Sequence, residues 1–281
     1  MPAPSRATYR LTIEYDGTRY RGWQVQQNAR SVAGELLRAL REAGHAPIEL
    51  GGSGRTDAGV HALAQVAHLR LAERVDPEAL RRAVNDRLPP DVHLLAAAAA
   101  PARFHARHDV VSRAYLYQLS RRRTAFAKRF VWWVKDEIDV DGLRRAAARL
   151  SGRGDFRRFC EQPAAQRSTL VEVEGVEVAE DGDLVLLRFV ASHFLWKMVR
   201  RLVGTLIQVA TGRLPAAGFA ALLDPAAEAP TGADPARWTA PPSGLFLERV
   251  RYSGDPPLPP IAPATPVRTP PTGRRTPVTP A

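Results

Sequence analysis

Two periods of hydrophobic and polar residues run along the chain and predict strands and helices that follow one another. Residues 11–15 alternate apolar and polar side chains, the period of a half-buried strand. Ser31, a good helix cap, precedes apolar residues that recur at helical spacing to Ala43. The same patterns predict strands at 65–71, 114–119 and 245–252, a hairpin of 171–178 with 184–190, and helices at 76–88, 141–150 and 195–206.

These elements predict an α+β fold of two related α/β halves, each with an antiparallel or mixed sheet. We expect an N-terminal half at 1–108 and a C-terminal half at 109–255. The remaining segment, 256–281, holds ten prolines, three arginines and no acidic residue, and it lacks an apolar period. This composition predicts an extended, disordered, basic tail.

Charge and cysteine content indicate what kind of partner the protein binds and in which compartment it works. The chain carries 40 basic and 29 acidic residues, a net charge of +11, and the three tail arginines leave +8 on residues 1–255. Such an excess suits a polyanionic partner such as RNA or DNA, although arginine-rich coding bias produces the same composition. A single cysteine, no apolar run of about 20 residues and no signal peptide predict a cytoplasmic protein without a membrane anchor.

The segment from Gly51 to His61 is the densest in candidate chemistry. Three glycines precede Arg55-Thr56-Asp57, and Gly59 follows. Glycines allow unusual backbone angles and close approach of another backbone, so such a loop can hold one carboxylate toward a ligand. The alternative interpretation is a polar turn that Asp57 caps. A phosphate-binding loop is disfavoured, because the Lys-Ser/Thr of that motif is missing.

Metal and thiol chemistry have little support. His105 and His108 are three residues apart, but no acid or cysteine stands at matching spacing, so we expect no metal site. His61 and His193 are interpreted as core or hydrogen-bonding histidines. Cys160 has no evident histidine partner and is interpreted as a buried structural thiol.

Two basic and aromatic groups could contact nucleic acid. Tyr115 and Tyr117 fall on one face of the strand at 114–119, where aromatic rings can stack on bases, but core positions are the alternative. Lys197, Arg200 and Arg201 lie on the polar side of the helix at 195–206, where the alternative is a solvated face.

The ordered set of motifs resembles the TruA family of tRNA pseudouridine synthases from about Tyr9 to Tyr252. The most specific piece is Gly54-Arg-Thr-Asp-Ala-Gly-Val-His61. The other matching pieces are Tyr15-Asp-Gly-Thr18, Gly22-Trp-Gln24, Asn85, Leu88-Pro89, Phe104-His-Ala-Arg107, Arg113-Ala-Tyr-Leu-Tyr117, Phe194, Met198-Val-Arg200, Val203-Gly204 and Gly244-Leu-Phe-Leu247.

The resemblance implies the pseudouridine synthase fold, with sheets joined across a central cleft, and a homodimer in which one tRNA touches both subunits. It implies isomerisation of uridines at positions 38 to 40 of the anticodon stem-loop to pseudouridine. By resemblance Asp57 is the nucleophile, Arg55 helps to extrude the base, Tyr115 stacks on it, and Arg200 pairs with the carboxylate. Leu245 is implied to pack beside the site. Lys197 and Arg201 are further candidates for RNA contact.

The implied reaction is chemically consistent with these residues. It breaks the bond from ribose C1′ to uracil N1 and forms one from C1′ to C5, so it needs no redox cofactor, ATP or metal. It needs an ionised nucleophile, which an aspartate supplies at neutral pH. Two rival functions are a non-catalytic RNA-binding protein and a glycosidase-like hydrolase. The hydrolase requires a second carboxylate near Asp57, for which Asp16 is the one candidate the sequence suggests.

Overall fold

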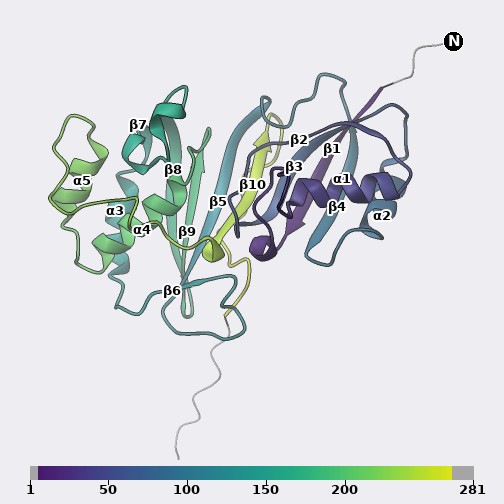
Figure 1. The fold of residues 1–281 in the computed structure, drawn as a ribbon. Helices are drawn as coiled ribbons and strands as arrows, with labels where there is room; N and C mark the ends of the chain where they lie inside the picture. The colour runs from purple at the N-terminus through teal and green to yellow at the C-terminus, as the bar shows by residue number, and fades with distance from the viewer. Residues whose placement is uncertain (1–5, 268–281) are drawn as a thin grey trace, which may run out of the picture.

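A computed structural model describes residues 6–267, which form one mixed sheet of ten strands with helices packed against it (Figure 1). The strand order is β4-β1-β3-β10-β5-β9-β8-β7, with β2 paired to β3 and β6 to β5. The strands are β1 (Ala7–Tyr15), β2 (Pro47–Gly52), β3 (His61–Leu71), β4 (Val92–Ala100), β5 (Val110–Ser120), β6 (Trp132–Trp133), β7 (Gly152–Asp155), β8 (Leu170–Asp181), β9 (Leu184–Ala191) and β10 (Leu245–Tyr252).

Helices α1, α2 and α3 begin directly after a residue whose side chain caps the first turn. Ser31, Asp76 and Asp139 each accept a hydrogen bond from a backbone N–H three residues later, which satisfies one of the free donors of the first turn. The helices are α1 (Val32–Glu42), α2 (Pro77–Asn85), α3 (Val140–Ala148), α4 (Met198–Ala210) and α5 (Ala216–Leu223), with 3-10 turns η1 (Gly17–Arg19), η2 (Arg157–Phe159), η3 (Pro163–Ala165) and η4 (Pro242–Gly244).

The last strand, β10, occupies the middle of the sheet and connects its two sides. It pairs in parallel with β3 through Phe246 and Leu247, and antiparallel with β5 along most of its length. The two sides of the sheet therefore form one continuous surface across β10. This architecture confirms the predicted α+β class, while the division into halves at 1–108 and 109–255 stays a prediction.

The sequence pattern does not predict strands β2, β4, β6 and β7 or helix α5, and β4 and α5 show the reasons. Strand β4 ends in a run of alanines, which favour helix by intrinsic propensity, yet these alanines pair with β1 in a regular antiparallel register. Helix α5 has only eight residues, and it lacks the side-chain cap that marks the starts of α1, α2 and α3. Pairing and packing with neighbours determine both elements.

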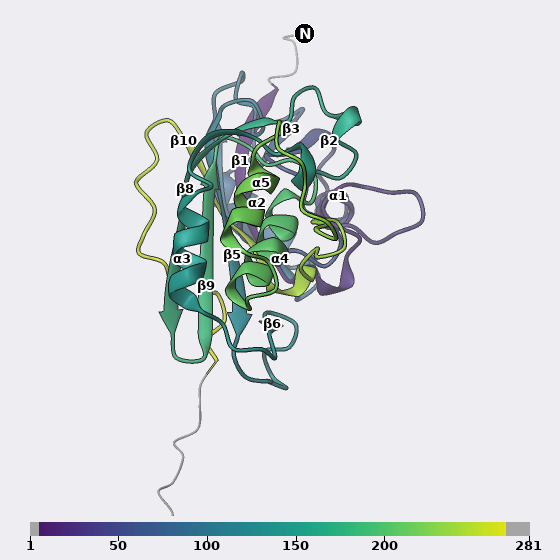
Figure 2. The ribbon, with the colours of Figure 1, turned by 90° about the vertical axis from the view of Figure 1, so that its left-hand side faces the viewer.

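Helices α1 and α4 lie on the same side of the sheet, one over each part of it (Figures 1 and 2). Their apolar faces are buried: Leu36 and Leu40 of α1, and Leu202 and Leu206 of α4, are at most 1% exposed. None of the helices within residues 6–267 is long and apolar enough to cross a membrane.

The prediction of a disordered tail from residue 256 is wrong for residues 256–267. This segment, called the strap below, follows β10 and runs along the opposite side of the sheet from α1 and α4 (Figure 2). Ile261, Ala264 and Val267 pack against the buried cluster that contains Leu116 and Phe246.

Buried polar side chains of the sheet also hold the strap. Gln118 Oε1 accepts hydrogen bonds from the backbone N–H groups of Ala264 (2.7 Å) and Thr265 (3.3 Å). Arg188, only 3% exposed, donates to the carbonyl oxygen of Pro259 at 2.8 Å. The apolar residues are too few and too irregular to give a period, which is why the sequence pattern did not reveal the docking. Residues 268–281 of the predicted tail lie outside the described residues.

Candidate active site

The glycine-rich segment forms a turn between β2 and β3 that the start of β3 holds in place. Ser53 donates its side-chain hydroxyl to Gln65 Oε1 at 2.8 Å, and Gln65 Nε2 donates back to the carbonyl oxygen of Gly54 at 2.9 Å. The N–H of Val60 donates to the carbonyl oxygen of Asp57 at 3.1 Å, which closes the turn around the carboxylate-bearing residue. Asp57 is thus presented by a fixed turn.

Gly17 and Gly22 explain why segments so far from Asp57 in sequence belong to the same site. A side chain on Gly22, whose φ is +96°, would place its Cβ 2.4 Å from the carbonyl oxygen of Thr56. A Cβ on Gly17 would lie 1.9 Å from the carbonyl oxygen of Val60. Both glycines are required because the backbone of the Asp57 turn lies directly against them. Tyr15 extends the contact, since its hydroxyl lies 2.8 Å from Thr56 Oγ1.

Arg200 pairs with Asp57, as the resemblance implies. Arg200 Nη1 lies 3.6 Å from Asp57 Oδ2, and the two side chains are 15% and 24% exposed. Burial raises the pKa of Asp57, and this effect outweighs the opposing influences of the Arg200 and Lys197 charges and of hydrogen bonding by Trp196. The carboxylate is therefore partly desolvated yet faces two cations, an arrangement suited to a reactive anion.

The first turn of α4 is oriented by the segment that leads into β10. Arg200 Nε donates to the carbonyl oxygen of Ala240 at 2.7 Å, and the N–H of Ala240 donates to the carbonyl oxygen of Arg200 at 3.0 Å. A Cβ on Gly204 would lie 1.6 Å from the carbonyl oxygen of Trp238. Glycine at 204 thus lets this segment lie against α4, which sets the direction from which Arg200 reaches Asp57.

Lys197 and Arg201, the two cations near Arg200 in the sequence, lie in different environments. Lys197, in a left-handed conformation with φ of +60°, is 30% exposed, and its Nζ lies 3.1 Å from Glu161 Oε1. Arg201 is buried, pairs with Glu161 and donates to the carbonyl oxygen of Cys160 at 2.6 Å. The assignment of Arg201 to RNA contact is therefore not supported, because its guanidinium is used inside the protein. Cys160 is buried, as expected of a structural thiol.

Tyr115, on β5, lies beside the Asp57 carboxylate. It is 8% exposed and meets Phe194 edge to face at 5.1 Å between ring centroids. Burial raises the pKa of Tyr115 to about 12, and the charge of Asp57 acts in the same direction. Tyr115 consequently stays neutral at physiological pH. Tyr117 is fully buried and donates to the carbonyl oxygen of Pro241 at 2.8 Å, which makes it a core residue.

Leu245 and Arg55, the two remaining candidate residues, differ in exposure. Leu245 is 5% exposed and pairs in register with Tyr117 at the start of β10. Arg55 is exposed on the turn and has no ion-pair partner among residues 6–267. Trp196, 43% exposed, was missed by sequence analysis, because one aromatic residue in a basic and apolar stretch has no distinguishing pattern.

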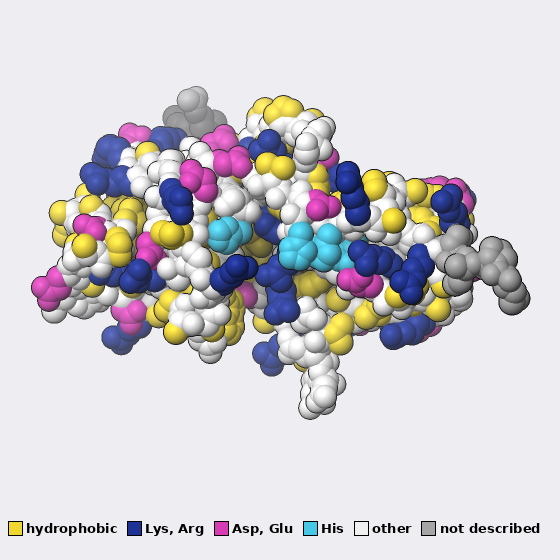
Figure 3. Space-filling model, turned by 90° about the horizontal axis from the view of Figure 1, so that it is seen from above, with side chains coloured by type: hydrophobic (Ala, Val, Ile, Leu, Met, Phe, Trp, Pro, Cys, Tyr) yellow, Lys and Arg dark blue, Asp and Glu magenta, His cyan; other side chains and the backbone are white. Residues whose placement is uncertain are grey.

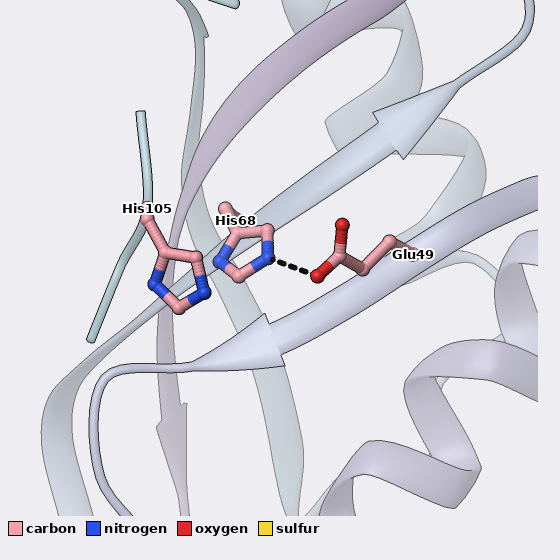
Figure 4. A group of neighbouring side chains, drawn as sticks. All are labelled: Glu49, His68 and His105. Atoms are coloured by element: carbon pink, nitrogen blue, oxygen red, sulfur yellow. Dashed lines mark ion pairs between the residues drawn. The ribbon is translucent and has the colours of Figure 1, made fainter. Parts of the chain in front are cut away.

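One group within residues 6–267 has the spacing of a metal site: Glu49, His68 and His105 (Figure 4). His68 Nδ1 accepts the N–H of Ala106 at 3.2 Å, and His105 Nδ1 accepts the N–H of Arg107 at 3.1 Å. A neutral imidazole that accepts a hydrogen bond at Nδ1 carries its proton at Nε2. A metal could bind Nε2 of either ring only if Nε2 lost that proton. His68 Nε2, 3.1 Å from Glu49 Oε1, is accordingly better described as a proton-bearing nitrogen beside a carboxylate than as a metal ligand.

Asp16 is committed elsewhere. Its carboxylate accepts hydrogen bonds from the N–H and hydroxyl of Thr18, and it pairs with His61 at 3.2 Å and Arg129 at 3.4 Å. Recesses of about 710 and 200 Å³ are among those in the described part of the chain, and Asp57 lines neither of these two. Asp16 lines the smaller one.

The α+β fold places one carboxylate, Asp57, beside the Arg200 cation and the ring of Tyr115, which is the arrangement that the resemblance implies. A family model described as tRNA pseudouridine synthase matches residues 11–109 and 146–253. The chain belongs to the tRNA pseudouridine synthase family, whose members are isomerases. The matched ranges include Asp57, Arg200 and Leu245, whereas Tyr115 lies between them.

Curated relatives agree with this assignment. The chain is 39% identical over 249 residues to the tRNA pseudouridine synthase A of Maricaulis maris (strain MCS10), an alignment that covers 88% of this chain and 98% of that protein. It is 40% identical over 247 residues to the enzyme of the same name from Rhodopseudomonas palustris (strain BisA53), covering 87% and 98%. A solved Cbf5-Nop10-Gar1 complex is similar at a TM-score of 0.34 and 12% identity, over 71% of this chain and 45% of that one, which is too distant to support an argument.

Proposed function

We propose that the protein converts uridines at positions 38 to 40 of the tRNA anticodon stem-loop to pseudouridine, with Asp57 as the nucleophile. The observation that carries the proposal is the Asp57 carboxylate, held on a fixed turn 3.6 Å from Arg200 and still 24% exposed. The names of the relatives support tRNA as the substrate. A cytoplasmic location is part of the same proposal.

The chemistry follows from the groups present. The reaction breaks the C1′–N1 bond, rotates the uracil and forms the C1′–C5 bond, and the proton on C5 leaves as N1 gains one. Covalent catalysis by a carboxylate divides this into two steps, whether the carboxylate attacks C1′ or the uracil ring. Both routes begin from ionised Asp57, which Arg200 and Lys197 favour against the opposing effect of burial.

The target uridine has to leave its stack, at a cost of a few kcal/mol. Arg55 is exposed on the Asp57 turn, so it is suited to enter the gap that the base leaves. Tyr115 offers an aromatic ring beside the carboxylate, and Leu245 contributes an apolar side chain at the start of β10. Because Tyr115 stays neutral, we assign it stacking rather than proton abstraction.

We assign the contacts with the tRNA phosphates to lysine and arginine side chains on the protein surface. Lys and Arg side chains spread over the whole width of the face seen in Figure 3, with acidic side chains between them and histidines near the middle. Lys197 is the half-exposed cation beside Asp57 and is the one we assign to RNA contact. A homodimer that binds one tRNA with both subunits is a further part of the proposal, which sedimentation of the free protein and its tRNA complex tests.

A glycosidase-like hydrolase is less well supported, because Asp16, its proposed second carboxylate, is engaged by Thr18, His61 and Arg129. One experiment separates the three functions: incubation with unmodified tRNA, chemical mapping of pseudouridine and an assay for free uracil. The proposal predicts pseudouridine at positions 38 to 40 and no uracil. Released uracil would indicate a hydrolase, and unchanged tRNA would indicate a binding protein.

A further inference from the structure

Arg113, on β5, is a buried cation without a carboxylate partner. It is 8% exposed, and within residues 6–267 no acidic side chain lies at ion-pair distance from it. Burial lowers the pKa of Arg113, as expected when a charge loses its hydration. Burying an unpaired charge is costly, so the contacts that the guanidinium does make have to offset a substantial penalty.

Those contacts are three carbonyl oxygens from three separate segments. Arg113 Nη2 donates to the carbonyl oxygen of Ser53 at 2.5 Å and, at 3.4 Å, to that of Arg107. Nη1 donates to the carbonyl oxygen of Ser192 at 3.0 Å. The planar guanidinium is suited to this task because its five N–H donors point in fixed, different directions.

Two of these segments carry the Asp57–Arg200 pair. Ser53 begins the turn that presents Asp57 four residues later, and Ser192 begins the connection from β9 to α4 that leads to Arg200. The third, at Arg107, belongs to the loop between β4 and β5. A Cβ on Gly54 would lie 3.5 Å from Arg113 Nε, so the turn also packs directly on the Arg113 side chain.

We propose that Arg113 is a positioning residue of the isomerase site: it fixes the Asp57 turn and the Arg200 segment relative to each other without touching the substrate. This inference rests on the proposed function. Displacement of a reacting group by about 1 Å can cost about a hundredfold in rate, so loss of the clamp should slow the chemical step far more than it weakens RNA binding.

The test compares Arg113→Met and Arg113→Lys with a matched control, Arg158→Met. Arg158 also donates to three carbonyl oxygens, those of Ala221, Asp224 and Ala227, but it secures the region around α5. Each full-length variant is assayed well below its Tm for single-turnover pseudouridine formation with enzyme in excess, and separately for tRNA affinity. Single-turnover conditions isolate the chemical step.

We expect Arg113→Met to slow that step about a hundredfold and to keep tRNA affinity within about threefold. Arg113→Lys, which retains the charge but not the fork of donors, should lose about tenfold. Arg158→Met should lower Tm and leave the rate within twofold of wild type. If Arg113→Met does not fold, Arg113→Lys carries the comparison.

Rates of the Arg113 variants within twofold of wild type, or equal losses in Arg158→Met, would overturn the inference. So would a loss of affinity as large as the loss of rate, because that would make Arg113 an RNA contact. Absence of pseudouridine with the wild-type protein would instead reject the proposed function and leave the clamp geometry untouched.

Discussion

Arg200 Nη1 lies 3.6 Å from Asp57 Oδ2, although 143 positions separate the two residues along the chain. The two side chains arrive from opposite sides of β10, one from the turn before β3 and the other from the first turn of α4. Burial and charge act in opposite directions on this carboxylate, and burial prevails, so its pKa is raised. The Arg200 and Lys197 charges limit that rise and so favour the ionised carboxylate.

Replacing Arg200 with methionine should make activity more sensitive to acid. Arg200 lowers the pKa of Asp57, so its loss raises that pKa further and leaves less ionised carboxylate as pH falls. The acid limb of the pH–rate profile should move to higher pH, so the ratio of the rate at pH 6 to the rate at pH 8 should be lower in the variant than in wild type. Arg200→Lys, which retains a charge, should shift the limb less. A methionine variant with the wild-type profile from pH 5 to 8 would remove Arg200 from the site.

Gly22→Ala should disrupt the Asp57 turn, because the new Cβ would lie 2.4 Å from the carbonyl oxygen of Thr56. Gly44→Ala is the matched control, since Gly44 also has a positive φ, +85°, but open space around it. The control should lose only the about 1–2 kcal/mol expected of left-handed backbone in alanine. Gly22→Ala should lose more stability in urea denaturation and most of its activity. Equal losses in the two variants would show that backbone strain alone is responsible.

Truncation after Asp255 should destabilise the protein, because it uncovers the apolar cluster against which Ile261, Ala264 and Val267 pack. These side chains are half-buried, so a loss of about 1–3 kcal/mol in the free energy of unfolding is expected. Ile261→Ser in the full chain tests docking without removing the tail arginines and should give part of this loss. Unchanged denaturation curves for both would show that the strap contributes nothing to stability.

Chelation should leave activity intact. Both Nδ1 atoms of His68 and His105 accept backbone N–H groups, so neither ring can bind a metal at Nε2 while it stays neutral. Treatment with EDTA followed by gel filtration should change the rate of pseudouridine formation less than twofold. A loss of activity that Zn²⁺ restores would contradict this account of the Glu49 group.

The sequence predicted most of the elements that carry the site, and the physical reasons are visible in them. Caps at Ser31 and Asp76 and the alternation of β10 are local signals, so they gave correct starts for α1 and α2 and the bounds of β10. The position of β10 between β3 and β5 is a matter of pairing between distant segments, which no local pattern encodes.

The site residues also divide into those that local motifs predict and those whose role depends on contacts with distant segments. Asp57 and Arg200 were found through motifs, and their contact agrees with the resemblance. Arg201 was misassigned, because helical spacing placed it with Lys197 on a polar face, whereas Glu161 from a distant segment draws it inward. Arg113 was noticed only as part of a motif, since its role depends on carbonyl oxygens that carry no mark in the sequence.

The nucleophile assignment is tested most directly by Asp57→Asn. Asparagine is nearly isosteric with aspartate and can still accept a hydrogen bond from Arg200, so the turn and tRNA affinity should stay close to wild type. A neutral amide cannot form the covalent intermediate, so the chemical step should stop.

The decisive measurement is single-turnover formation of pseudouridine at positions 38 to 40 by Asp57→Asn, with enzyme in excess over unmodified tRNA and binding confirmed separately. The account predicts a variant that binds tRNA and forms no detectable pseudouridine, while wild type converts the same tRNA. Pseudouridine formed by the variant at even a few per cent of the wild-type rate would contradict Asp57 as the nucleophile.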